Sequence, residues 1–371
     1  MSGEGILEHS TTGEYKKTGN FQREELILST LEPSRVSNPE QDIDAVMRES
    51  GPDYDYFTFE RPTAGHQGEV FLVTLGYRGE EYEVVVKFQA DDPGFALEPF
   101  LHEFVADRTD IPVPRILVFK EEPELDVQPY FVTERVTGEN LVELLSDFSP
   151  ETFEAVIEHA GSILGDMHSE IGFEGFGQLA LKDGRLIVDN LSWDWQQFFA
   201  DIVHGYIDQL DGTPFENLQT TARQRFDDNL PIIETSPVPR LVHDDFRPAN
   251  VMFDDEGERP ISAVLDWQFA LAADPEYHIC RTDFLFIDPS FRDRATREHL
   301  RNRLYEGYRE NRAFDPDEGF EQRRRLYHFA TLLWRMVGFD AAFADFSGLA
   351  RGRAEVRYRQ QFEYLLRELP E

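Results

Sequence analysis

The feature of the sequence that most constrains the fold is a polar loop held between short apolar runs at residues 241–253. After a turn, a further apolar run at residues 263–265 ends in a carboxylate, Asp266. Short apolar runs on both sides of a polar segment predict strands that fix the loop at its two ends. The loop and the following run therefore supply candidate residues for chemistry: His243, Asp245, Asn250 and Asp266.

The bulk composition describes a globular protein. The chain has 371 residues, of which 40% are hydrophobic and 13% aromatic, which is enough for two lobes with their own cores. No stretch approaches the apolar length of a membrane helix, and residues 1–9 lack the basic region and apolar run of a signal peptide. We therefore expect a cytoplasmic protein. Cys280 is the sole cysteine, which excludes an internal disulfide and a cysteine metal cluster.

The charge of the chain narrows the range of partners. It has 72 acidic and 36 basic residues, for a net charge of -36, and only five of the basic residues are lysines. Such a chain repels phosphate backbones and anionic lipids, so we expect neither nucleic acid nor membrane surfaces as partners. Excess carboxylate with scarce lysine is typical of proteins from salt-loving organisms, although an acidic mesophilic protein is an alternative. Acidic patches in this chain say little about a cationic substrate.

The N-terminal part of the chain changes character near residue 54. Residues 1–50 are polar and predict an extension that is partly disordered, with one helix-like segment at 39–48. Strands are then predicted at residues 57–59, 69–75 and 82–88, the last two as a hairpin. The turn before the hairpin contains Gly65 and Gly68, and it either lays backbone N–H groups over phosphates or is an ordinary loop.

Lys87 ends the apolar strand at residues 82–88, where a solvated lysine would be out of place. The alternative is an edge-strand lysine that discourages aggregation. A helix is predicted at 95–106, with Glu98 in its first turn and Glu103 farther along. A strand lysine paired with a glutamate of the next helix holds the α- and β-phosphates in kinases. Glu98 is the preferred partner, with Glu103 as the fallback.

The spacing of the polar loop suits phosphoryl transfer, which requires bound phosphates, Mg²⁺ and an acceptor hydroxyl beside a base. Asp245 has the position for orienting the hydroxyl and accepting its proton. Asn250, five residues on, would supply a neutral oxygen to Mg²⁺, and Asp266 a charged one. Lys87 would grip the phosphates, and His243 would shape the loop.

Together these motifs resemble the aminoglycoside phosphotransferase and choline-kinase-like family of small-molecule kinases. The resemblance covers roughly residues 57–346. It rests on His243-Asp244-Asp245-Phe246-Arg247-Pro248-Ala249-Asn250-Val251, Leu265-Asp266-Trp267, Ala273-Asp274-Pro275, Ile111-Pro112-Val113-Pro114, Leu164-Gly165-Asp166-Met167-His168 and Phe176-Gly177. Leu-Asp-Trp in place of Asp-Phe-Gly, and the lack of an Ala-Pro-Glu segment, separate the chain from protein kinases.

The resemblance implies an α+β, bilobal protein-kinase-like fold, with a small antiparallel-sheet N-lobe at residues 51–133 and a larger, mainly helical C-lobe at 134–371. It implies ATP and Mg²⁺ as cofactors and a hinge near residues 130–138, where Thr133 and Arg135 would join Lys87, Glu98, Gly65 and Gly68 around the nucleotide. The γ-phosphate would pass to a hydroxyl of a small molecule bound by C-lobe helices. Aminoglycosides, choline, sugars and amino-acid alcohols all fit this frame.

The chain departs from the family pattern at three places. The family usually has Gly where this chain has Asp244, it often has Asp where this chain has His278, and the turn at Gly65 and Gly68 is poor in glycine. A carboxylate beside the base would raise the pKa of the base by repulsion, or have no effect if its side chain points away. The alternative function is therefore a nucleotide-binding pseudokinase with a sensing or scaffolding role.

Overall fold

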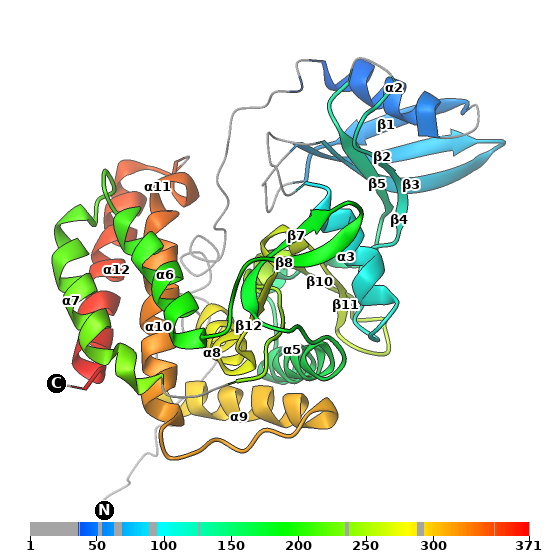
Figure 1. Cartoon of the computed structure of the whole chain (residues 1–371). Helices are drawn as coiled ribbons and strands as arrows, with labels where there is room; N and C mark the ends of the chain where they lie inside the picture. The colour runs from blue at the N-terminus through cyan, green and yellow to red at the C-terminus, as the bar shows by residue number, and fades with distance from the viewer. Residues whose placement is uncertain are drawn as a thin grey trace, which may run out of the picture.

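The chain folds into two lobes of unequal size (Figure 1). The computed structural model describes residues 36, 38–50, 54–62, 69–88, 95–124, 127–233, 237–287, 293–344 and 346–370. The smaller lobe is built on an antiparallel sheet and the larger one is mainly helical, so the expected α+β bilobal fold is confirmed. None of the helices in the described ranges combines the length and apolar character needed to cross a membrane.

The sheet of the smaller lobe has five strands in the order β1-β2-β3-β5-β4. Their bounds are β1 Tyr56–Glu60, β2 Glu69–Tyr77, β3 Glu80–Phe88, β4 Ile116–Lys120 and β5 Tyr130–Glu134. The predicted hairpin joins β2 to β3 through Arg78 and Gly79, whose φ angles of 53° and 85° match the two-residue turn that fits the twist of paired strands. Residues alternate along β3, so Val85 and Lys87 face one side of the sheet, while Val84 and Val86 face the other.

The side of the sheet away from Lys87 is covered by helix α2, Pro39–Ser50 (Figure 1). Ile43, Val46 and Met47 of α2 are buried in one cluster with the alternate residues of β2 and β3. The sequence predicted this helix but assigned it to a polar extension. It instead forms part of the small-lobe core, because its apolar residues recur every three to four positions and make one buried stripe. Residues 1–35, which include the rest of the expected extension, lie outside the described residues.

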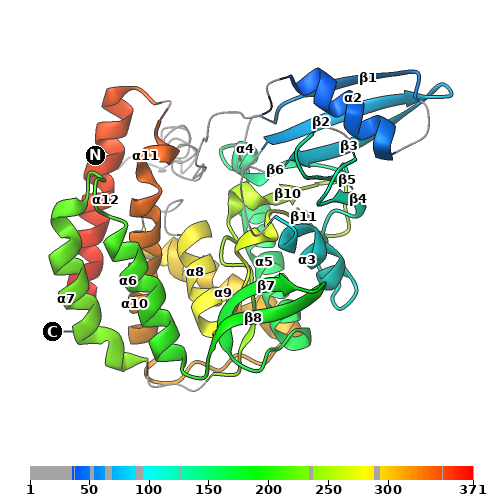
Figure 2. The same cartoon turned by 45° about the horizontal axis from the view of Figure 1, so that its top comes forward.

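Helix α3, Leu97–Ala106, lies between the small sheet and the rest of the protein (Figure 2). Its apolar side chains Leu97, Leu101 and Val105 join the core of the larger lobe. Phe95, just before the helix, packs against Phe131 of β5, with 5.3 Å between ring centroids. The helix is therefore fixed on both sides, which holds its first turn in place beside β3.

Two small sheets of the larger lobe hold the polar loop at residues 243–250. The first has the order β8-β7-β12-β9 and the second β11-β10-β6. Their bounds are β6 Glu139–Asn140, β7 Phe176–Lys182, β8 Arg185–Ser192, β9 Arg240–Val242, β10 Val251–Phe253, β11 Ile261–Val264 and β12 Leu271–Ala273. The loop leaves β9 in one sheet and enters β10 in the other, so both of its ends are anchored by strand pairing, as the flanking apolar runs predicted.

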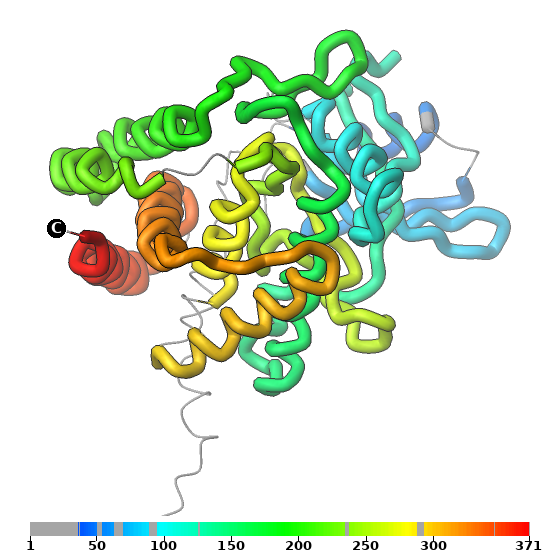
Figure 3. The backbone as a smooth tube through the Cα atoms, turned by 60° about the horizontal axis from the view of Figure 1, so that its bottom comes forward, coloured from blue at the N-terminus to red at the C-terminus, as the bar shows by residue number. Residues whose placement is uncertain are grey.

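The helices of the larger lobe form two groups. Helices α5 and α9 pack closely along their length (Figure 3), and an added Cβ at Gly161 or Gly307 would overlap the backbone of the opposite helix. Helices α6, α7, α10 and α12 form the second group, with α8 between the two (Figure 2). The bounds are α4 Leu141–Leu144, α5 Pro150–Glu170, α6 Trp195–Asp208, α7 Gln219–Asn229, α8 Pro275–Phe286, α9 Arg294–Asn311, α10 Phe320–Val337, α11 Phe339–Ala342 and α12 Gly348–Glu368.

Glycine and serine positions set the boundaries of the last helices. Gly338 ends α10 and separates it from α11. Helix α12 begins at Gly348, where the Ser347 side chain accepts a hydrogen bond from the Ala350 N–H and caps the helix.

Candidate active site

Lys87 lies between two carboxylates from different parts of the chain. Its Nζ donates to Glu98 Oε2 at 2.6 Å and to Asp266 Oδ1 at 3.0 Å. All three residues are largely buried, and burial alone would lower the pKa of the lysine. The two carboxylates outweigh burial and raise the pKa of Lys87 above its usual value, so it stays charged. Glu103 is exposed on the same helix, so Glu98, the preferred partner, pairs with Lys87.

Asp266 follows β11 in a left-handed conformation, with φ 66°. Burial favours its neutral form, but Lys87 overcomes this and holds the pKa of Asp266 below its usual range. Trp267 is buried next to it and donates its indole N–H to Val264 O at 3.1 Å. The conformation and the anchored tryptophan turn the carboxylate towards Lys87.

Asp245 is held from two sides within the polar loop. Arg247 Nε donates to its Oδ1 at 2.7 Å, and Asn250 Nδ2 donates to its Oδ2 at 2.7 Å and to its backbone oxygen at 2.9 Å. Residues 248–250 form a single turn of 3₁₀-helix that places the amide of Asn250 opposite Asp245. The carboxylate is therefore buried and fixed in one orientation. A fixed orientation suits a group that has to accept a proton from a hydroxyl placed in line.

His243 ties the loop to the strand that carries Asp266. Its Nε2 lies 2.9 Å from Leu265 O, and its ring packs on Trp267 with 4.6 Å between centroids. The backbone adds a further link, because Leu265 N donates to Asn250 O at 2.9 Å. Burial lowers the pKa of His243, so the neutral ring donates its Nε2–H to the carbonyl. The histidine therefore links the polar loop to the residues around Asp266.

Asp244 occupies the position where the family pattern usually has glycine, and its backbone conformation explains the preference for glycine. Its φ is 59°, in the left-handed region that glycine adopts freely and that aspartate is among the few other residues to tolerate. Its carboxylate accepts from Tyr277 OH at 2.7 Å and lies 3.3 Å from Arg281 Nε. Burial raises the pKa of Asp244, opposed by Arg281 and Tyr277. The extra carboxylate is thus held by α8.

A cavity of about 380 Å³ lies between the two lobes. Its walls include the charged residues Lys87, Glu98 and Asp266 and the expected hinge residues Thr133 and Arg135. The apolar part of the wall is formed by Val70, Leu72, Val85, Phe131, Met252 and Leu265. Thr133 is buried in β5, and Arg135 Nη1 bonds Glu83 at 2.9 Å. Apolar walls with polar groups at one end suit a flat base with charged phosphates. Gly65 and Gly68 lie outside the described residues.

A second and larger cavity, of about 1450 Å³, adjoins the other side of the polar loop. Asp245 lines this cavity, whereas Asn250, Asp266 and Lys87 line the first one. Helices α6, α8 and α10 contribute Tyr206, Arg281 and Trp334 to its wall. The polar loop therefore separates two spaces, with the fixed carboxylate facing the larger one.

The oxygens of Asn250 and Asp266 are suitable ligands for a hard divalent cation. The amide nitrogen of Asn250 is engaged by Asp245, which leaves the amide oxygen for another partner, and both side chains line the smaller cavity. Within the described residues no group of three or more His, Cys, Asp or Glu side chains forms a complete cage. Mg²⁺ is usually held by one or two protein oxygens together with substrate phosphates, and this pair fits that pattern.

Sequence reasoning missed several residues that shape the site. Arg247 lies inside the predicted loop, and a basic residue two positions after a carboxylate is the sequence signal that could have identified it. Tyr277 and Arg281 are more than thirty residues away in sequence, and nothing local links them to Asp244. His102 also lines the smaller cavity, where burial lowers its pKa to about 4 and keeps it neutral.

Comparisons with known proteins concern the sequence pattern and the fold of the chain. The family model described as the phosphotransferase enzyme family matches residues 58–319. No curated protein matches the sequence. The structure of aminoglycoside phosphotransferase APH(4)-Ia is similar, with a TM-score of 0.59, 18% identity, and coverage of 90% of this chain and 100% of that chain. A thermostable mutant of the same protein was solved with ADP and hygromycin B.

Two further solved structures show the same fold. A proposed aminoglycoside phosphotransferase from Ralstonia eutropha has a TM-score of 0.56 and 17% identity, and covers 89% of this chain and 97% of that chain. A proposed fructosamine-3-kinase from Thermobifida fusca has a TM-score of 0.55 and 17% identity, with coverage of 88% and 97%. At this level of identity the likeness concerns the fold.

Proposed function

The chain belongs to the phosphotransferase enzyme family, and on this premise we propose that it transfers the γ-phosphate of ATP, with Mg²⁺, to a hydroxyl group of a small molecule. The observation that carries the proposal is the position of Lys87 between Glu98 and Asp266, at the wall of a cavity that Asn250 also lines. The fixed carboxylate of Asp245 faces the neighbouring cavity. This is the arrangement that transfer between two bound molecules needs.

Nucleotide binding is assigned to the smaller cavity. Lys87 would bind the phosphates through its charged Nζ, and Glu98 would keep that amine in place. Thr133 and Arg135 line the same cavity, and there the backbone of β5 and the following residues would meet the base. Gly65 and Gly68 remain candidates for phosphate contacts.

Asn250 and Asp266 would hold Mg²⁺, which when bound neutralises charge on the phosphates. Asp245 would orient the acceptor hydroxyl and take up its proton. Two hydrogen bonds from Arg247 and Asn250 already fix the carboxylate, so little reorganisation is needed as the proton moves. His243 would keep this loop in register with the strand that carries Asp266.

We further propose lobe limits and a setting for the protein. The N-lobe would comprise α2 together with the residues up to 133, and the C-lobe would begin at 134. The excess of 72 acidic over 36 basic residues supports a cytoplasmic protein of a salt-loving organism.

The acceptor would occupy the larger cavity. Hygromycin B, with which one of the structural relatives was solved, is one example of a hydroxyl-bearing ligand.

The experiment is a screen for ADP formation with Mg²⁺ and ATP in concentrated KCl, with a panel of sugars, amino alcohols, hydroxy acids and aminoglycosides. We expect at least one compound to stimulate ADP formation by the wild-type protein. The variant Asp245→Asn should lose this stimulation by a factor of about 10² to 10⁴, the usual contribution of a positioned base. Unchanged affinity for a nonhydrolysable ATP analogue would show that the variant retains its nucleotide site.

Two results would oppose the proposal. Full turnover by the Asp245→Asn variant would remove Asp245 from the reaction. Tight binding of Mg²⁺ and ATP, without transfer to any compound in the panel, would favour the pseudokinase alternative. The main reason for that alternative is weaker now, because the Asp244 carboxylate is held by Tyr277 and Arg281.

A further inference from the structure

The wall of the larger cavity contains an arginine, Arg281, whose two outer nitrogens are buried. Arg281 is 1% exposed and comes from α8, and its Nε donates to Asp244 O at 2.5 Å. Its Nη1 and Nη2 are buried and make no hydrogen bond of good geometry within the described part of the chain. Buried polar groups are nearly always satisfied, so these two nitrogens indicate a missing ligand.

The surroundings of Arg281 fix its guanidinium plane. The Trp334 ring centroid lies 4.3 Å from Arg281 Cζ, and the Tyr277 ring centroid lies 5.8 Å from it. The Tyr206 hydroxyl is near enough to interact with Arg281 and Tyr277, and burial raises the pKa of both tyrosines, so they stay neutral. Asp244 engages the Nε side of the guanidinium. The outer edge, with two parallel donors, is left for a planar anion.

The charges deep in the cavity differ from those at its rim. The rim carries exposed acids, Asp183, Asp189 and Asp201, as does the surface of the whole chain. The buried charged residues are Asp244, Asp245, Arg281 and Arg335. Exposed charges mainly affect encounter with a ligand, whereas buried donors that would otherwise stay unpaired discriminate strongly between ligands. The outer nitrogens of Arg281, which make no hydrogen bond within the described residues, therefore favour an anionic group on the acceptor.

We propose that the outer edge of Arg281 binds a carboxylate of the acceptor, which makes the acceptor a small hydroxy acid. This inference rests on the proposed function for the role of the hydroxyl group. Asp245 lines the same cavity, and Arg281 is bonded to the residue just before it, so the carboxylate and the reacting hydroxyl are close neighbours in the substrate. A guanidinium edge matches a carboxylate with two parallel hydrogen bonds, which neither an amine nor a neutral alcohol provides.

The test uses two sets of compounds that share hydroxyl groups and differ in charge. One set is glucuronate, glucose and glucosamine, and the other is 4-hydroxybutyrate, 1,4-butanediol and 4-amino-1-butanol. Binding is measured by calorimetry with the full chain saturated with Mg²⁺ and a nonhydrolysable ATP analogue. In at least one set we expect the acid to bind at least tenfold more tightly than the other two members. Equal or tighter binding of the amine or the neutral compound in both sets, or no binding of either acid, overturns the inference.

Variants separate a ligand contact from a structural role. Arg281→Gln should remove the preference for the acid and leave the affinity for the neutral member unchanged, while Arg281→Lys should keep part of the preference. Arg223→Gln is the matched control, because Arg223 is partly exposed on α7, pairs with Asp208 and lies outside both cavities. A folded Arg281→Gln protein that still prefers the acid overturns the inference. If Arg281→Gln does not fold, the wild-type preference and the Arg281→Lys result decide.

The two proposals fail in different ways. Binding of an acid that depends on Arg281, without phosphoryl transfer to any compound, would oppose the proposed kinase function and support the carboxylate site. Phosphoryl transfer only to hydroxyl groups of amino compounds or of neutral alcohols would support the kinase function and overturn the carboxylate site.

Discussion

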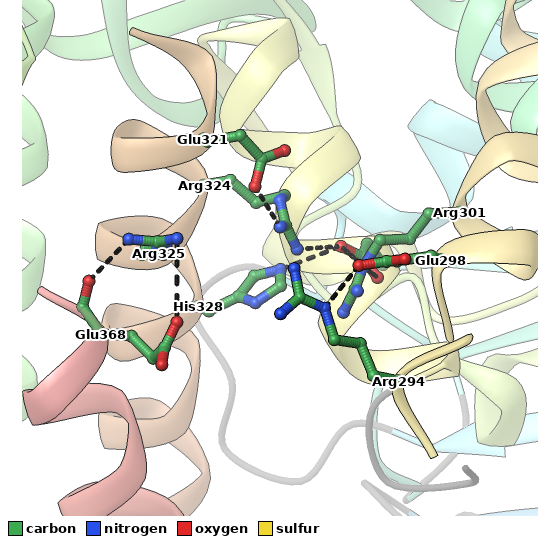
Figure 4. A network of polar contacts seen from close by, with 9 residues as sticks. Arg294, Glu298, Arg301, Glu321, Arg324, Arg325, His328 and Glu368 are labelled. Atoms are coloured by element: carbon green, nitrogen blue, oxygen red, sulfur yellow. Dashed lines mark hydrogen bonds and ion pairs between the residues drawn. The ribbon is translucent and has the colours of Figure 1, made fainter. Parts of the chain in front are cut away.

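A buried ion network joins three helices of the larger lobe, and its removal tests how the lobe is held together (Figure 4). Asp283 of α8 has no exposed surface and accepts from Arg301 Nε of α9 at 2.8 and 2.7 Å. It also lies 3.1 Å from His328 Nε2 and 3.5 Å from Arg324 Nη1, both on α10. Burial opposes its ionisation, but Arg301 and His328 hold the pKa of Asp283 well below its usual range.

The perturbation is Asp283→Asn, which keeps the shape of the side chain and removes its charge. Breaking a buried ion pair from one side typically costs 3–5 kcal/mol, because the partner charge stays buried. The amide retains one acceptor for Arg301, so we expect about 3 kcal/mol of lost unfolding free energy, near the lower end of this range. For a lobe of this size that is a fall of roughly 6–12 °C in melting temperature, at about 2–4 °C per kcal/mol.

The assay is urea unfolding followed by circular dichroism at several pH values. Because the folded pKa of Asp283 is depressed, its contribution is present above the unfolded pKa near 4 and is lost as pH falls below it. The wild-type advantage over Asp283→Asn should therefore shrink on acidification. The control is Glu298→Gln in the same network, because its pair with Arg294 is exposed to solvent and contributes little to stability. Equal stability of the Asp283→Asn and wild-type proteins at neutral pH would refute the reasoning.

Three further predictions concern the site, pH and salt. Glu98→Gln should weaken binding of ADP with Mg²⁺ about tenfold in a fluorescence titration, because Lys87 loses a partner that positions it, at a cost of about 1.4 kcal/mol. The control is Glu103→Gln, which should have no effect, because Glu103 is exposed on the same helix and lies outside the smaller cavity. Equal effects of the two variants would remove Glu98 from its role. Burial raises the pKa of Asp274 to about 7, so the folded state favours its neutral form. The free energy of unfolding should therefore fall by up to about 4 kcal/mol as pH rises from about 4 to 7. Asp274→Asn should flatten this slope in unfolding curves at pH 5 and 8, and an unchanged slope would contradict the assignment. The net charge of -36 predicts that melting temperature rises with KCl, and a flat salt dependence in thermal scans would oppose the halophilic origin.

The parts of the fold that sequence predicted well are those whose signal is local. The β2–β3 hairpin has alternating apolar residues around a two-residue turn, and its register places Lys87 on the side that faces the cavity. The loop between β9 and β10 was identifiable because apolar runs define both of its ends. The partnership of Lys87 with Glu98 followed from chain order and the general chemistry of phosphate binding.

Other features depend on contacts that sequence periodicity does not encode. Helix α8 is buried on all sides, so it has no polar face and no helical period to detect. Only Ala222, Phe226 and Asn229 are buried in α7, which leaves little pattern. The sequence pattern shows which side of α2 is apolar, but not which element covers that side. In the structure the small sheet covers it. The contacts of Asp244 with Tyr277 and Arg281 arise from a distant helix and could be found only in three dimensions.

The measurement that tests the central claim most directly follows the γ-phosphate itself. The full chain is incubated with Mg²⁺ and ATP labelled at the γ-phosphate, together with the compound that gives the greatest ADP formation, and the products are separated. The claim predicts that the label appears on a hydroxyl of that compound in amounts equal to the ADP formed, and that Asp245→Asn abolishes its appearance. Label found only in inorganic phosphate, or retained in ATP with every compound tried, would contradict the claim.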